Sequence, residues 1–148
     1  MRTVVAASLC LLVACGHAIY RYPMTMGRAS SEPNGQGLRM SVEWLKGKQK
    51  SIDVALFFEN RYAFPISVKR GYIKLSWQDR TGALRDTGGS IVLGPGQNAR
   101  EILIYQFWPE IPAEGGEVTI AVDAVHKADG TESPGATLRL PMLRQYRE

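Results

Sequence analysis

Cysteine and histidine are nearly absent from this chain. Both cysteines, Cys10 and Cys15, lie close to the N-terminus, so beyond them a disulfide framework, a cysteine metal site and a cysteine nucleophile are all excluded. The histidines are His17 and His126, and no spacing of His, Asp or Glu supplies the three or four ligands that a metal site normally requires. We therefore expect no metal and no cofactor, and for His126 a hydrogen-bonded structural role at a strand end.

Sequence signatures of catalysis are missing as well. Glu117 and Asp123 belong to one expected strand and lie about 20 Å apart along it, whereas a glycosidase pair needs its carboxyls within roughly 5–10 Å. No serine has a nucleophile-elbow context, and no glycine pattern resembles a phosphate loop. We expect no enzymatic activity. The alternative is a hydrolase whose site is assembled across strands, which requires a concave pocket with converging polar groups.

A clustered positive charge and a long hydrophobic run are also missing. The net charge of +4 is scattered along the chain, so nucleic acid is not an expected partner. Arg2 is the only charge before Cys15, and the uncharged residues 3–14 span only about 18 Å as a helix. Because a bilayer crossing needs about 20 apolar residues, this run fits a signal peptide better than a transmembrane helix.

The apolar run ends in Leu12-Val13-Ala14-Cys15, which resembles the lipobox of bacterial lipoproteins. The resemblance implies that residues 1–14 are a removed signal peptide and that lipid, including palmitate, on Cys15 holds the protein to a membrane. An Asp after the cysteine is absent, which resembles the sorting pattern for the outer membrane of diderm bacteria, on the face toward the periplasm. The alternative is ordinary secretion, with cleavage after Gly16 or Ala18 releasing a soluble protein without either cysteine.

The remaining chain divides by composition into a tether, one domain and a short tail. Residues 15–37 contain the lipidated cysteine and a segment that becomes rich in Ser, Gly, Pro and Asn, which indicates a flexible tether with a typical end-to-end distance near 25 Å. Residues 38–143 form the predicted domain, and residues 144–148 a C-terminal tail. Tyr20-Arg21-Tyr22 lies close to the lipid site, where aromatic and basic side chains suit a membrane interface. The alternative is that these residues are ordinary linker composition.

Alternating apolar residues predict short strands throughout the domain, and no stretch offers a helical stripe. The inward-facing sets include Trp44 at the end of the first alternating segment and Ala124 at the end of another. Residues 102–107 are almost continuously apolar, which indicates a strand covered on both faces or lying at an interface. Glycine and proline turns separate the segments. The expected fold is an all-β, immunoglobulin-like antiparallel β-sandwich of about seven strands.

Turn chemistry carries a resemblance to immunoglobulin-like and fibronectin-III-like domains. The segment 57–60 ends a strand in Asn60 before Pro65, the segment 75–82 ends in an Asp-x-x-Gly turn, and Leu93-Gly94-Pro95-Gly96-Gln97 precedes another strand. The cysteine pair of immunoglobulin domains is absent. The resemblance implies the architecture and leaves the function open.

Aromatic residues supply the binding hypothesis. Tyr105, Phe107 and Trp108 lie where a strand runs into a proline-bearing loop, and Tyr62 belongs to a second aromatic loop. We expect the sandwich to bind or scaffold another envelope protein through such residues. The alternative is a carbohydrate-binding module that stacks exposed aromatic rings on cell-wall or surface glycans. An alternative structural role for Phe107 or Trp108 is to plug the end of the sandwich.

Overall fold

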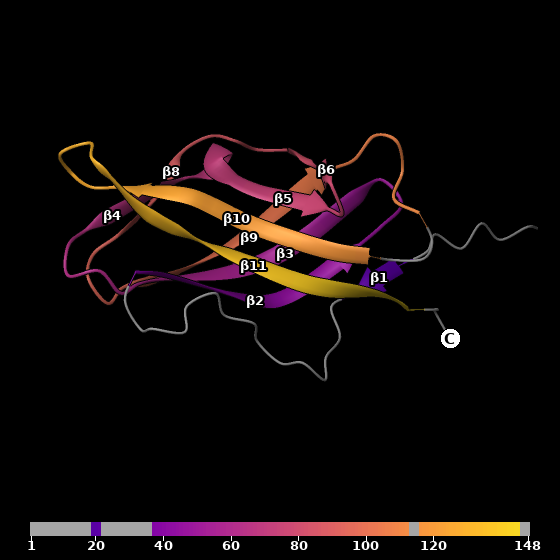
Figure 1. Ribbon diagram of the computed structural model, residues 1–148, viewed down its shortest axis with the longest axis horizontal. Coiled ribbons are helices and arrows are strands. Elements are labelled where there is room, and N and C mark those ends of the chain that lie inside the picture. The colour runs from indigo at the N-terminus through magenta and orange to yellow at the C-terminus, as the bar shows by residue number, and fades with distance from the viewer. Residues whose placement is uncertain (1–18, 22–36, 113–115, 146–148) are drawn as a thin grey trace, which may run out of the picture.

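The computed structural model describes residues 19–21, 37–112 and 116–145, whose regular secondary structure is almost entirely β-strand (Figure 1). The strands are β1 (Ile19–Arg21), β2 (Leu38–Gly47), β3 (Ser51–Asn60), β4 (Ile66–Lys69), β5 (Ile73–Trp77), β6 (Arg80–Thr81), β7 (Ala83–Leu84), β8 (Ser90–Leu93), β9 (Asn98–Gln106), β10 (Gly116–His126) and β11 (Glu132–Gln145). A short 3-10 helix, η2 (Arg70–Tyr72), separates β4 from β5. None of the helical structure in these ranges is long and apolar enough to cross a membrane.

The strands form two antiparallel sheets packed face to face. One sheet has the order β2-β3-β9-β7, and the other centres on β10, which pairs with β11, β5 and β4; β8 pairs with β4 and β6 with β5. Three of the eleven described strands, β1, β6 and β7, have only two or three residues each. Since β4 and β5 share one side of β10, they occupy one strand position, and the eight longer strands fill seven positions of the sandwich. The predicted fold class, an all-β antiparallel sandwich, is confirmed. In Figure 1, β4 and β8 lie near one end of the molecule and β1 near the other.

Apolar side chains from both sheets fill the space between the layers. The inward positions alternate along most of the strands, as the period-two pattern predicts. The largest fully buried side chains are Tyr105, Phe58, Leu38, Met40, Ile52, Leu56, Ile66, Ile73, Leu75, Ile120 and Leu140. The described core contains no cysteine, so apolar burial and hydrogen bonds hold it together.

Two predicted inward residues are placed differently by the structure. Trp44 is 36% exposed, because β2 bulges between Val42 and Trp44 while β3 continues without an extra residue. The bulge shifts the alternation by one position, and Leu45 is buried in place of Trp44.

On β10 the inward series passes from Val122 to Val125, and the predicted Ala124 is only partly buried. Gly135 of β11 lies opposite this point, so close that a Cβ on it would overlap the Val122 carbonyl group. This close approach allows the two strands to bend together.

The strand β9 differs from its prediction in how it is covered. Ile102 is 51% exposed and Ile104 is partly exposed, while Leu103 and Tyr105 are buried. The strand therefore has one core face and one apolar outer face, so the expectation that both faces are covered is wrong. The other expectation, that it lies at an interface, stays a prediction.

The predicted tether also requires a correction. Ile19–Arg21 forms β1, which pairs with β11 and with the last residues of β2. A tripeptide is too short to show a period-two pattern, so the sequence offered no signal for this strand. The ordered domain thus begins before residue 38, and β11 extends past residue 143 to Gln145. Cys15 and the predicted signal peptide lie outside the described residues.

Candidate functional site

The loop after β9 presents one tryptophan to solvent from a fixed backbone. Phe107 and Ile111 are buried, whereas Trp108 between them is 85% exposed. The Phe107 amide donates to the Lys50 carbonyl oxygen (2.9 Å), and the Ile111 amide donates to the Gln49 carbonyl oxygen (2.7 Å). The backbone on both sides of Trp108 is therefore tied to the turn between β2 and β3. The peptide bond between Trp108 and Pro109 is cis.

Arg80 holds the same loop from the other sheet. Its guanidinium donates to the carbonyl oxygens of Pro109 and Glu110. The guanidinium carbon lies 5.7 Å from the centre of the Trp77 ring and 5.9 Å from that of Phe107, both within the range of cation–π attraction. Arg80 thus fixes the backbone directly after Trp108. A preorganised exposed tryptophan is the kind of group that anchors a binding surface.

The structure does not bring the four predicted binding residues together. Tyr105 is buried, donating its hydroxyl hydrogen to the Ile73 carbonyl oxygen at 2.7 Å, and burial raises its pKa above the ordinary value. Phe107 is also in the core, where it closes the end of the sandwich beside Trp108. Of the three aromatic residues near the end of β9, only Trp108 offers its ring to a ligand.

Tyr62 lies at the opposite end of the sandwich. Tyr62 comes two residues after the last residue of β3. The Trp108 loop is instead hydrogen-bonded to the turn that precedes the first residue of β3. The ten residues of β3 therefore separate the two by roughly 30 Å. The Tyr62 ring stacks on Phe64 with ring centres 4.8 Å apart, and its hydroxyl donates to the Pro134 carbonyl oxygen at 2.6 Å. Through these contacts, Tyr62 links the β3–β4 connection to β11.

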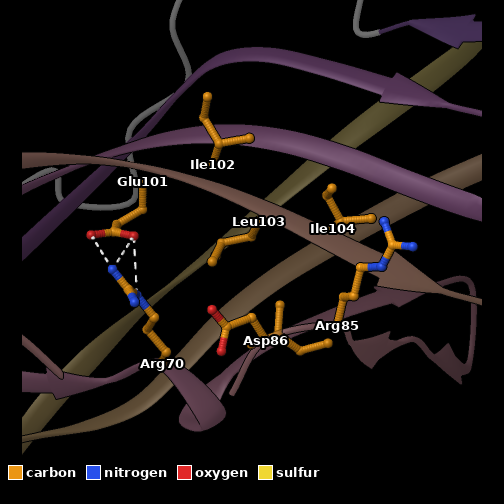
Figure 2. Close-up of a pocket in the computed structure, with 8 residues that line it drawn as sticks. Arg70, Arg85, Asp86, Glu101, Ile102, Leu103 and Ile104 are labelled. Atoms are coloured by element: carbon orange, nitrogen blue, oxygen red, sulfur yellow. Dashed lines mark hydrogen bonds and ion pairs between the residues drawn. The ribbon is translucent and has the colours of Figure 1, made fainter. Parts of the chain in front are cut away.

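A pocket lies between β9 and the two segments that contain Arg70 and residues 84–86 (Figure 2). Figure 2 shows the Arg70 guanidinium facing the Glu101 carboxylate, and the Arg70 Nε and Nη2 atoms each donate to a Glu101 oxygen at 3.1 Å. These contacts raise the pKa of Arg70 above its ordinary value, first through the hydrogen bond and then through the charge of Glu101. Leu84, Ile102, Leu103 and Ile104 supply the apolar lining of the pocket.

The pocket is a weak candidate for a ligand site. Its volume of about 230 Å³ is below the roughly 300–1,000 Å³ of typical small-molecule sites. Arg70 and Glu101 satisfy each other, and since Arg70 follows β4 and Glu101 lies on β9, their pair ties one sheet to the other. Sequence reasoning did not find the pair, because its members are 31 residues apart and neither belongs to a local motif.

His126 lies at the end of β10, as expected. Its Nε2 atom is 3.2 Å from the Glu132 carboxylate, and its ring centre is 5.9 Å from that of Tyr72. The Nδ1 atom is buried without a hydrogen-bond partner among the described residues. Across those same residues, no cluster of three or more His, Cys, Asp or Glu side chains is placed to hold a metal ion.

An exposed tryptophan on an immunoglobulin-like sandwich is therefore the most distinctive surface feature of the described chain. No protein-family model and no curated protein match the sequence. Among solved structures, the fold is similar to that of YcdA from Bacillus subtilis, provisionally described as a lipoprotein, with a TM-score of 0.52 and 10% sequence identity. The similarity covers 77% of this chain and 38% of that one. At this identity it shows a shared fold alone.

Proposed function

We propose that this protein is a non-catalytic lipoprotein of the bacterial cell envelope. Lipid on Cys15 holds it at the outer membrane on the side facing the periplasm, and its β-sandwich binds or scaffolds another envelope component. The observation that carries the proposal is the sequence Leu12-Val13-Ala14-Cys15 at the end of a short uncharged run. The description of YcdA as a lipoprotein adds support, since the two chains share a fold.

The geometry of the described domain favours binding over catalysis. The carboxylate and guanidinium of the pocket in Figure 2 are paired with each other, so neither is poised to transfer a proton or to hold a charged substrate. The exposed Trp108 and the outer apolar face of β9 are instead typical of contact surfaces. Anchoring restricts the search for a partner to the membrane surface and raises the effective concentration there.

Metabolic labelling tests the anchor. Cells grown with a clickable palmitate analogue should label the wild-type protein, and Cys15→Ser should abolish the label. Cys10→Ser is the matched control, because it removes the other cysteine of the leader and should leave labelling intact. A wild-type protein that takes no label and appears in soluble fractions contradicts the proposal and favours ordinary secretion.

Crosslinking in the native envelope tests the binding role. We expect mass spectrometry of the crosslinked species to identify an envelope protein that is recovered with wild type and lost with Cys15→Ser. Recovery of the same partner regardless of the anchor contradicts the view that membrane attachment guides the encounter.

A second candidate is a carbohydrate-binding module, favoured by the 85% exposure of Trp108, since exposed indole rings stack on sugars. A pull-down on cell-wall and surface glycans should then retain wild type and lose Trp108→Ala. Trp44→Ala, at a less exposed tryptophan on β2, is the matched control. Equal retention of wild type and Trp108→Ala excludes Trp108 as the sugar platform.

A further inference from the structure

The strand β1 leaves little chain between the proposed lipid site and the folded domain. The strand begins at Ile19, so only Gly16, His17 and Ala18 separate it from Cys15. Four Cα-to-Cα steps reach at most about 14 Å. This inference rests on the proposed lipidation of Cys15. Given that lipid, the domain lies next to the headgroups and does not stand off on a long tether.

The strand register fixes which end of the sandwich faces the lipid. Arg21 pairs with Lys46 and Tyr20 with Gly47, the last residue of β2. Followed backward, β1 therefore runs toward the turn between β2 and β3, and the chain that precedes it emerges at that end. In Figure 1, β1 lies beside the C-terminal end of β11, at the end of the molecule opposite β4 and β8.

Trp108 lies at this same end. Its loop is hydrogen-bonded on both sides to Lys50 and Gln49 of the β2–β3 turn, and Arg80 holds the loop carbonyls from the second sheet. In Figure 1 the loop that follows β9 lies toward the end that carries β1. The most exposed large apolar side chain of the described residues and the proposed lipid site thus share one end of the domain.

The residues at this end suit insertion into the interfacial region of a bilayer better than a purely electrostatic contact with lipid headgroups. Tryptophan is enriched where headgroups meet acyl chains, because its ring is apolar and its N–H is polar. The lysines of the β2–β3 turn are largely paired: Lys48 lies 3.1 Å from Asp53, and Lys50 lies 3.5 Å from Glu110. The attraction to anionic lipid is correspondingly reduced. Trp108 therefore dominates the contact.

We propose that the end of the sandwich formed by β1, the β2–β3 turn and the Trp108 loop rests on the bilayer, with Trp108 inserted at the headgroup level. The lipid on Cys15 and the indole of Trp108 act as two membrane contacts on one rigid body, and together they set the orientation of the domain. The opposite end, with Tyr62 and Phe64, points toward the periplasm.

Fluorescence quenching by brominated lipid tests the insertion. The mature lipidated protein, which begins at Cys15, is purified from membranes and reconstituted into vesicles of phosphatidylethanolamine and phosphatidylglycerol, with bromine near the top of some acyl chains. We expect a quenched component with blue-shifted emission in wild type. Trp108→Phe should lose it with an unchanged circular dichroism spectrum, because the side chain is at the surface. Trp44→Phe is the matched control and should retain it.

Two results overturn the inference in distinguishable ways. An unmodified mass for Cys15 refutes the proposed function and this inference with it. Lipid on Cys15 combined with a Trp108 component that brominated lipid does not quench refutes the inference alone. In that second case, protection of Trp108 from iodide after addition of peptidoglycan or of an envelope protein assigns the residue to that partner instead.

Discussion

Asn60 is the polar residue whose loss should damage the sandwich most. It is the buried polar side chain of the described core, with 0% exposure. Its Nδ2 atom donates to the carbonyl oxygens of Phe64 (2.9 Å) and Leu93 (3.0 Å), and its Oδ1 atom accepts from the Tyr62 amide (2.9 Å). One amide thus joins the end of β3, the connection that leads to β4, and the end of β8. No other residue type of this size offers two donors and an acceptor in the same plane.

The magnitude follows from these three hydrogen bonds. Asn60→Ala removes all of them, each worth about 0.5–1.5 kcal/mol, and leaves the buried Leu93 carbonyl without this donor. We expect a loss of about 3–4 kcal/mol in the free energy of unfolding. Asn60→Asp should be at least as destabilising at neutral pH, because a carboxylate donates nothing and faces two carbonyl oxygens. Its pKa is raised by that environment, so the lost stability should partly return as the pH falls toward about 4.

Urea unfolding followed by circular dichroism at pH 7 and pH 4.5 measures both effects. A loss of about 3 kcal/mol corresponds to a melting temperature lower by roughly 10 °C for a domain of this size. Asn98→Ala and Asn98→Asp, at an exposed position at the start of β9, are the matched controls and should stay within about 0.5 kcal/mol of wild type. If both Asn60 variants unfold within about 1 kcal/mol of wild type, the assignment of Asn60 as the link between these segments is refuted.

Two further predictions concern the core. Burial raises the pKa of Tyr105, so the folded state keeps its proton when the unfolded chain loses it. Stability is then fully present below about pH 10 and falls by about 1.4 kcal/mol per pH unit above it. Tyr105→Phe should flatten that fall in urea titrations while losing about 1 kcal/mol at pH 7 with the bond to Ile73; an unchanged alkaline slope contradicts this. Gly135→Ala forces a Cβ into the Val122 carbonyl group and should destabilise by at least about 3 kcal/mol, whereas Gly71→Ala, with only ordinary contacts at 3.6 Å, should melt close to wild type.

The sequence predicted the sandwich because most of its strands alternate visibly. Where the prediction misplaced a side chain, the direction of that side chain depends on the neighbouring strand and not on the local sequence. Nothing in Val42-Glu43-Trp44 distinguishes an unbroken strand from a bulged one, since the pairing of Trp44 with Ala55 depends on β3. The exposure of Ile102 likewise depends on whether a neighbour covers the outer face of β9, and the local pattern carries no information on that point.

The sequence predicted that Trp108 and its aromatic neighbours belong to the candidate site. It did not predict which of them point outward or which residue fixes the loop. Phe107 and Trp108 are adjacent aromatic residues, and only the bond from the Phe107 amide to Lys50 shows which of them turns inward. Arg80, which fixes the loop, is 29 residues from the Pro109 carbonyl that it binds, and no periodicity or turn signal relates them. Residues that belong to one strand were therefore predictable, while those that act across strands required the structure.

The short strand β1 changes the functional reasoning more than any side chain does. A free tether of residues 15–37 leaves the orientation of the domain undefined, and every surface is then equally available to a partner. With Ile19 already paired to β11, the proposed lipid lies at one end of a rigid body, and the two ends become chemically distinct. In the proposed orientation, the end with Trp108 faces the bilayer, and the end with Tyr62, roughly 30 Å away along β3, is left for a partner. That orientation predicts that an envelope partner approaches the distal end or the flank formed by β9, where Ile102 is exposed.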